Sequence, residues 1–232
     1  MSRWELIDTT EIPGGGGELR LFGRDDEFAI RIAGGQGDLM NSRTHGSEDA
    51  LGQLACEPLR NRTGARVLIG GLGMGFTLAA ALACLPADAE LVVAELVPGV
   101  VAWNQDRLGV CAGFPLEDSR VRVEQDDVGK LIRGASAQFD AILLDVDNGP
   151  EGLTHPDNDR LYSLEGLSAA YRALKPSGTL AVWSVSPAKA FVKRMRSVGF
   201  GVDERRIRAH GGKGSRHIIW LGRRVQAAGR KQ

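Results

Sequence analysis

The stretch VLIGGLGMGFT, residues 67–77, decides the fold of this chain. Its apolar beginning, residues 67–70, predicts a short buried strand, and residues 76–85 predict an Ala- and Leu-rich helix. Four glycines connect the two elements: Gly70, Gly71, Gly73 and Gly75. Glycines let the backbone turn sharply and let a ligand approach closely, and the N-terminus of the helix attracts negative charge. This loop therefore predicts a site for a pyrophosphate or an amino-acid carboxylate.

An acidic residue at the end of the next predicted strand strengthens this interpretation. Residues 91–95 read LVVAE, so that Glu95 ends this strand 20 residues after Gly75. A carboxylate at this place can accept hydrogen bonds from both ribose hydroxyls of a nucleoside. The alternative without a ligand is that the glycines form a packing turn and Glu95 is a surface acid. This alternative requires the glycine loop, the acid and their spacing to coincide by chance.

The glycine spacing distinguishes two kinds of nucleoside. An NAD fingerprint, G-x-G-x-x-G/A, would begin at Gly71 and require Gly or Ala at position 76, which is Phe. The observed G-x-G-x-G instead resembles the first motif of class I S-adenosylmethionine-dependent methyltransferases. That resemblance implies S-adenosylmethionine as the cofactor, with its ribose on Glu95. It also implies that Asp126 or its neighbour Asp127 faces the adenine, and the sequence does not choose between them.

The rest of the chain extends the strand–helix alternation on both sides of this loop. Further strands are expected at residues 120–124, 139–145 and 178–184, helices at 47–59, 98–108, 159–174 and 187–198, and two C-terminal strands near 202–208 and 217–221. We therefore expect an α/β fold with a Rossmann-like, doubly wound, mostly parallel sheet over residues 43–232. Alternating short runs between Gly-rich turns predict a small antiparallel β unit over residues 1–42.

An acidic loop follows the fourth expected strand, FDAILLD at residues 139–145. Ligands of doubly wound sheets bind beyond the carboxyl ends of the central strands, so this loop should face the glycine loop. Asp145 is the candidate catalytic residue that orients a nucleophile or accepts its proton, with a turn or capping acid as the alternative. Candidate substrate contacts are Asp147, Asn148 and Tyr162. The alternatives are that Asp147 is a solvated loop acid and that Tyr162 is an aromatic residue of the core.

These segments together resemble the spermidine synthase (polyamine aminopropyltransferase) family over nearly the whole chain. The carrying residues are VLIGGLGMG, AELVPGVV, the Asp126–Asp127 pair and FDAILLDVDNGPEGL followed by RLYS. The resemblance implies that Asp145 matches the aspartate that binds and deprotonates the attacking amine, and it implies a homodimer. Three departures stand out: the family's GGGDGG aspartate falls at Gly73, the last acid of its D-S-S-D stretch falls at Asn148, and its Tyr-His-Glu segment aligns near residues 47–49.

The departures determine which reaction the sequence favours. Gly73 removes both a partner for the ammonium of decarboxylated S-adenosylmethionine and the repulsion of a methionine carboxylate. We therefore expect methyl transfer from S-adenosylmethionine to a small, cationic acceptor. The alternative is aminopropyl transfer from decarboxylated S-adenosylmethionine to putrescine or a related amine. A second alternative is a catalytically inactive nucleoside-binding protein.

Composition bounds the partners and the location. Lys+Arg and Asp+Glu both total 29, and this balance disfavours a general nucleic-acid or membrane-surface binder. No stretch approaches the ~20 apolar residues of a membrane span, and the N-terminus lacks a signal-peptide core. Neither the three cysteines nor the four histidines have metal-ligand spacing, so we expect no metal and a reducing cytoplasm.

Overall fold

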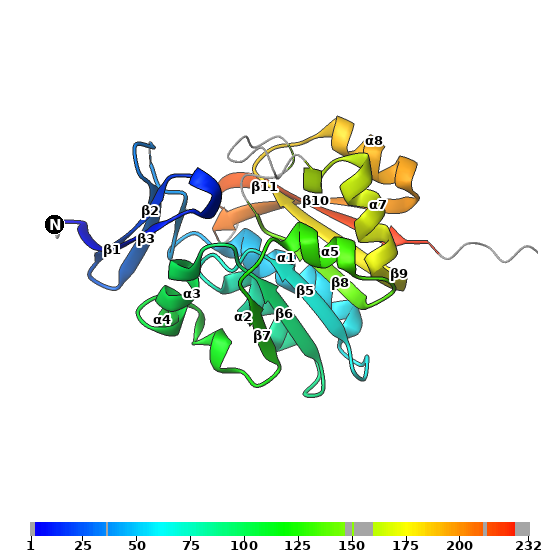
Figure 1. Ribbon diagram of the computed structural model, residues 1–232, viewed down its shortest axis with the longest axis horizontal. Coiled ribbons are helices and arrows are strands. Elements are labelled where there is room, and N and C mark those ends of the chain that lie inside the picture. Colours follow the sequence, from blue (N-terminus) through cyan, green and yellow to red (C-terminus); the bar gives the residue numbers. More distant parts are fainter. Residues whose placement is uncertain (1–2, 36, 147–149, 151–159, 211–212, 226–232) are drawn as a thin grey trace, which may run out of the picture.

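The computed structural model describes residues 3–35, 37–146, 150, 160–210 and 213–225. It has an α/β architecture with a large sheet between two helix layers and a smaller sheet at one end (Figure 1). The expected fold class is confirmed: the large sheet is mostly parallel and the small one is antiparallel.

The seven-stranded sheet has the order β10-β11-β9-β8-β5-β6-β7. Its strands are β5 (Arg66–Gly70), β6 (Glu90–Ala94), β7 (Val121–Glu124), β8 (Phe139–Leu144), β9 (Leu174–Ser184), β10 (Phe200–His210) and β11 (Lys213–Arg224). Within this sheet β11 pairs antiparallel with both of its neighbours, whereas β5 to β9 pair in parallel. The chain order reverses between β5 and β8, so the switch point lies beside the glycine loop.

Helices cover both faces of this sheet because its central strands are apolar on both faces. All six residues of β8 are buried, and those of β5 alternate between two hydrophobic cores. One face carries α1 (Gly46–Cys56), α2 (Phe76–Cys84) and α3 (Pro98–Gln105), with the short α4 (Gly109–Ala112) beyond. The other carries α5 (Val128–Gly134), α7 (Leu164–Ala173) and α8 (Lys189–Val198).

The first four strands form a separate antiparallel sheet in the order β1-β2-β3-β4. They are β1 (Glu5–Glu11), β2 (Glu18–Arg24), β3 (Glu27–Ile32) and β4 (Met40–Asn41). This sheet is fastened to α3, where the Trp103 indole N–H donates to the Asp8 carboxylate at 2.7 Å. Thr10 packs so closely on Gly99 that a side chain there would overlap it. The N-terminal sheet is thereby held next to the edge where the strands of the large sheet end.

Two helix boundaries differ from those expected. α1 begins at Gly46, one residue before the expected start at 47, with His45 in the N-cap position and Ser47 buried in the first turn. The helix expected at residues 159–174 is interrupted: residues 160–161 are helical, and after a break α7 begins at Leu164, where Ser163 caps it by accepting from the Gly166 N–H at 3.1 Å. It also ends sooner, since Leu174 already starts β9.

Candidate active site

The glycine loop between β5 and α2 needs glycine for conformational reasons. Gly71, Gly73 and Gly75 have φ values of +87°, +53° and +82°, which are strained for any residue with a side chain. A Cβ on Gly71 would also overlap the carbonyl oxygen of Asp145. In addition, the Asp145 N–H donates to the Gly70 carbonyl at 2.8 Å. The loop and the end of β8 therefore lie in direct contact.

Glu95 fastens the glycine loop from the end of β6. The residue is 8% exposed, and its two carboxylate oxygens accept from the N–H groups of Leu72 and Val97, each at 2.9 Å. Burial raises its pKa, while the bonds to the backbone N–H groups act in the opposite direction. A carboxylate has room for about four hydrogen bonds. Binding to ribose hydroxyls through the remaining positions stays a prediction.

The structure gives different surroundings to the two acids after β7. Asp127 is the N-cap of α5, where its carboxylate accepts from the Gly129 N–H at 2.7 Å. Asp126 is exposed and pairs with Lys130 at 2.8 Å, which lowers the pKa of its carboxyl. Because Asp127 already caps the helix, Asp126 is the better candidate for the adenine.

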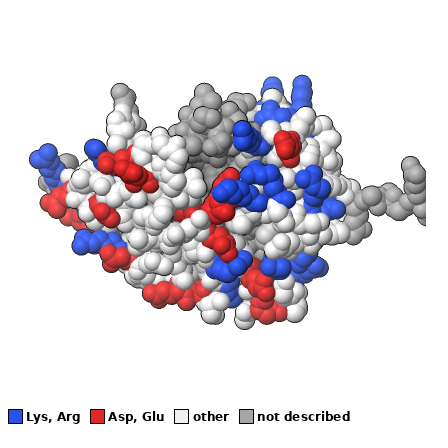
Figure 2. Space-filling model, in the orientation of Figure 1, with Lys and Arg blue, Asp and Glu red and all other residues white. Residues whose placement is uncertain are grey.

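On the face of the molecule that Figure 2 shows, Lys and Arg side chains gather over α5, α7 and α8.

Asp145 and Glu48 form an acidic pair at the carboxyl end of β8. Asp145 follows β8, Glu48 lies in the first turn of α1, and both are half-buried. Burial, and then the charge of Glu48, raise the pKa of Asp145 to about 7. Burial also raises the pKa of Glu48. Such a pair can hold a cation and exchange a proton near neutral pH.

Thr77 opposes this rise in the pKa of Asp145. Its hydroxyl, one residue into α2, donates to Asp145 Oδ2 at 2.7 Å and so stabilises the carboxylate. We expect Thr77→Val to raise the pKa of Asp145 by about one unit, since a hydrogen bond to a charged group is worth about 1.5–3 kcal/mol. Carboxyl ¹³C chemical shifts followed against pH measure this directly. An unchanged or lower pKa would contradict the assignment.

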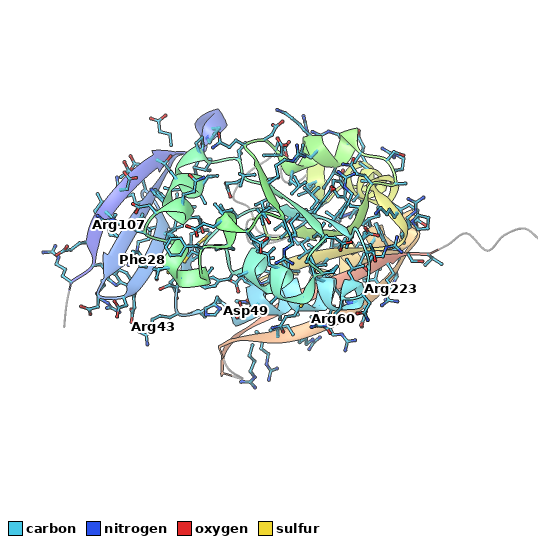
Figure 3. The ribbon with its side chains drawn as sticks, turned by 90° about the horizontal axis from the view of Figure 1, so that it is seen from below. Phe28, Arg43, Asp49, Arg60, Arg107 and Arg223 are labelled. Atoms are coloured by element: carbon cyan, nitrogen blue, oxygen red, sulfur yellow. The ribbon has the colours of Figure 1, made fainter. Side chains whose placement is uncertain are left out.

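Glu48 has no pattern around it that distinguishes it in the sequence. The family's Tyr-His-Glu segment aligns near residues 47–49, where its Tyr and His are missing and only an acid is present. The neighbouring His45 stacks on Phe76 at 4.0 Å and contacts Asp49 at 2.8 Å, which fixes the first turn of α1 over the start of α2. Figure 3 shows Asp49 at the end of the helix layer that faces the four-stranded sheet. Phe28 and Arg43 are labelled at that sheet.

Of the three candidate substrate residues, the structure describes Tyr162. Tyr162 is buried, its ring packs edge-on against Phe191 at 5.7 Å, and its hydroxyl donates to the Val146 carbonyl at 3.3 Å. It thereby supports the backbone just after Asp145. Asp147 and Asn148 lie outside the described residues. A substrate contact by any of these three residues stays a prediction.

Two further observations concern metals and membranes. Among the residues that the structure describes, no group of three or more His, Cys, Asp or Glu could hold a metal ion. In the same part of the chain, no helix combines the length and the apolar character needed to cross a membrane.

Comparison with solved structures first defines the class of protein. The chain superposes on a spermidine synthase in complex with the transition-state analogue AdoDATO with a TM-score of 0.75, at 16% identity, covering 96% of this chain and 74% of that one. Spermidine synthase from Thermotoga maritima gives 0.71 at 17% identity, covering 96% and 72%. A probable spermidine synthase from Corynebacterium glutamicum ATCC 13032 gives 0.68 at 16%, covering 96% and 82%. The fold is that of spermidine synthases.

The sequence comparison then gives the relatives. The chain is 34% identical over 152 residues to the polyamine aminopropyltransferases of Mycobacterium tuberculosis (strains CDC 1551 / Oshkosh and ATCC 25618 / H37Rv) and Mycobacterium bovis (strain ATCC BAA-935 / AF2122/97). The match covers 60% of this chain and only 28% of the length of these relatives. No protein-family model matches the chain. The chain is thus homologous to polyamine aminopropyltransferases in sequence and similar to spermidine synthases in structure.

Proposed function

We propose that this chain is a transferase that moves an aminopropyl group from decarboxylated S-adenosylmethionine to putrescine or a related amine. The observation that carries the proposal is the Glu48–Asp145 pair beside the glycine loop, with the pKa of Asp145 near neutrality. Two carboxyl groups suit an ammonium ion, and a carboxyl with such a pKa suits the removal of its proton. The homology to polyamine aminopropyltransferases supports the same reaction.

The residues present fit a nucleoside donor. Glycine at positions 71 and 75 lets the loop pack tightly, against Asp145 at Gly71 and against Asn104 and Pro115 at Gly75, and α2 starts immediately after Gly75. Since Gly75 has no side chain to cap the helix, the first N–H groups of α2 are available to a ligand. We place the ribose on Glu95 and the adenine near Asp126. Residues 1–42 would then act as a small unit beside the donor site of domain 43–232, because Met40 Sδ lies 3.3 Å from where a Cβ on Gly73 would be.

The chemistry divides between the donor and the chain. A sulfonium donor supplies electrophilic carbon atoms next to its sulfur. Glu48 and Asp145 hold the acceptor ammonium, and Asp145 takes one of its protons. The freed nitrogen lone pair forms the new nitrogen–carbon bond in line with the carbon–sulfur bond that breaks, whose electrons stay on sulfur in a neutral thioether. Alignment of these atoms supplies much of the rate.

One observation favours methyl transfer from intact S-adenosylmethionine as a second candidate. Gly73 places no carboxylate in the loop, and the neighbouring Met40 thioether is uncharged. A methionine carboxylate would therefore meet no repulsion there and could rest on the N-terminus of α2.

Incubation of the purified chain with each donor and a panel of small amines separates the candidates, with products identified by mass spectrometry. We expect an aminopropylated amine from the decarboxylated donor. A methylated amine from S-adenosylmethionine would replace the proposal by methyl transfer. Nucleoside binding in isothermal titration without any product would indicate a catalytically inactive nucleoside-binding protein. Absence of binding would overturn all three.

A further inference from the structure

A chain of hydrogen bonds leads away from the acidic pair to a histidine of β11. Ser47 Oγ lies 2.6 Å from Glu48 Oε2 and 2.7 Å from His217 Nδ1, although 170 positions separate Ser47 and His217 in the sequence. Ser47 is fully buried, whereas His217 is half-buried. The three groups therefore link the half-buried carboxyl pair of α1 and β8 to the half-buried ring of His217 on β11.

The hydrogen atoms of this chain have two consistent arrangements, because a serine hydroxyl carries one hydrogen. When Glu48 is a carboxylate, Ser47 donates to it and His217 must donate from Nδ1. When Glu48 is protonated, it donates to Ser47, Ser47 donates to Nδ1, and the hydrogen of the neutral ring is on Nε2. The protonation state of Glu48 thus determines the tautomer of His217.

We propose that His217, Ser47 and Glu48 form a proton relay that carries the proton of the acceptor amine from the half-buried carboxyl pair to water. Asp145 passes the proton that it took from the amine to Glu48, its partner in the acidic pair. The proton of Glu48 then moves to Ser47 Oγ, the serine hydrogen moves to His217 Nδ1, and the Nε2 proton leaves to water. Four O–H or N–H bonds break and four form, and Asp145 and Glu48 are both restored as carboxylates. The inference rests on the proposed function for the origin of the proton, and it makes Ser47 and His217 positioning residues.

The surroundings suit this role. The groups whose charges act on Glu48 are His45 and Asp49 at the start of the same helix and Asp145 beyond β8. The ring of His217 packs edge-on against Trp183 of β9, with centroids 4.8 Å apart. Burial lowers the pKa of His217, so the ring is neutral at pH 7 and passes a proton on without retaining it.

The decisive experiment follows the tautomer of His217 by ¹⁵N NMR during a pH titration of the full chain. We expect the hydrogen of the neutral ring to be on Nδ1 while Glu48 is a carboxylate and on Nε2 once Glu48 is protonated. Ser47→Ala should abolish this switch, whereas His45→Asn, a change at the other histidine near Glu48, should preserve it. A single tautomer at every pH would overturn the relay, whether or not the chain turns out to be a transferase.

Turnover supplies the second readout. His217→Asn keeps an N–H that can reach Ser47 but cannot pass a proton on, so it tests the relay separately from packing. We expect Ser47→Ala and His217→Asn each to lower kcat by about 10- to 100-fold, with donor affinity within about two-fold. Wild-type kcat in His217→Asn would reduce the histidine to a structural role. A tautomer switch without transferase activity would refute the proposed function and leave the coupling of Glu48 to His217 standing.

Discussion

Asp145→Asn is expected to lower kcat about 10³-fold or more while leaving the affinity for the donor nucleoside within a few-fold. Asparagine keeps the size and the hydrogen bond from the Thr77 hydroxyl, but it can neither neutralise an ammonium nor take its proton. Steady-state kinetics and isothermal titration measure the two quantities. A loss of kcat below about tenfold would exclude Asp145 as the proton acceptor.

The same substitution should stabilise the folded protein at alkaline pH. The pKa of Asp145 is raised from 3.8 to about 7 by folding, so the folded state binds a proton more tightly than the unfolded state. The contribution of this carboxyl to the free energy of unfolding therefore falls as pH rises from about 4 to about 7. Above that window the contribution stays constant. The full shift corresponds to about 4 kcal/mol, and water at this half-buried group reduces it to roughly 1–3 kcal/mol. Urea unfolding should show Asp145→Asn to be more stable than wild type at pH 8.5 and similar to it at pH 4.

Gly71→Ala is expected to have the second-largest effect, a loss of about 3 kcal/mol or more of unfolding free energy together with loss of nucleoside binding. Two costs add at this position. The backbone has φ +87°, and the new methyl group would overlap the backbone carbonyl of Asp145, which cannot move without breaking the bond from the Asp145 N–H to Gly70. Any relief by backbone movement separates β8 from the glycine loop and so deforms both halves of the site.

Gly113→Ala is the matched control for this prediction. Its φ is +74°, close to that of Gly71, but no described atom lies within 4 Å of where its Cβ would be. We expect it to cost about 1 kcal/mol from backbone strain alone and to leave nucleoside binding unchanged. Equal destabilisation by the two substitutions would show that backbone strain dominates and that contact between the glycine loop and β8 is not essential.

Local signals in the sequence predicted most of the fold because they act over short distances. The apolar run, the glycines and the following helix at residues 67–85 correspond to β5, the loop and α2, and Glu95 stands directly after β6. The strand expected at residues 178–184 begins earlier, because β9 starts at Leu174. The hydroxyl of Ser47 contacts a distant partner, His217, and no local pattern in the sequence indicates that contact.

The candidate site could be predicted only where one stretch of chain contains it. Motifs in the sequence indicate the glycine loop, Glu95 and Asp145 as candidates, whereas Glu48 and His217 carry no local signal that distinguishes them from other polar residues. Their roles depend on which side chains meet, because the 2.7 Å contact between Ser47 and His217 joins α1 to β11.

By itself the sequence determined that this chain folds as a doubly wound α/β protein with a glycine-lined loop facing Asp145. Hydrophobic periodicity and glycine spacing act between near neighbours, and so they are legible in one dimension. Only the tertiary structure decided that Glu48 lies beside Asp145, that the pKa of Asp145 rises to about 7, and that Ser47 connects the pair to His217. The physical reason is that desolvation and charge–charge interaction depend on distances in space, which folding sets between residues far apart in the chain.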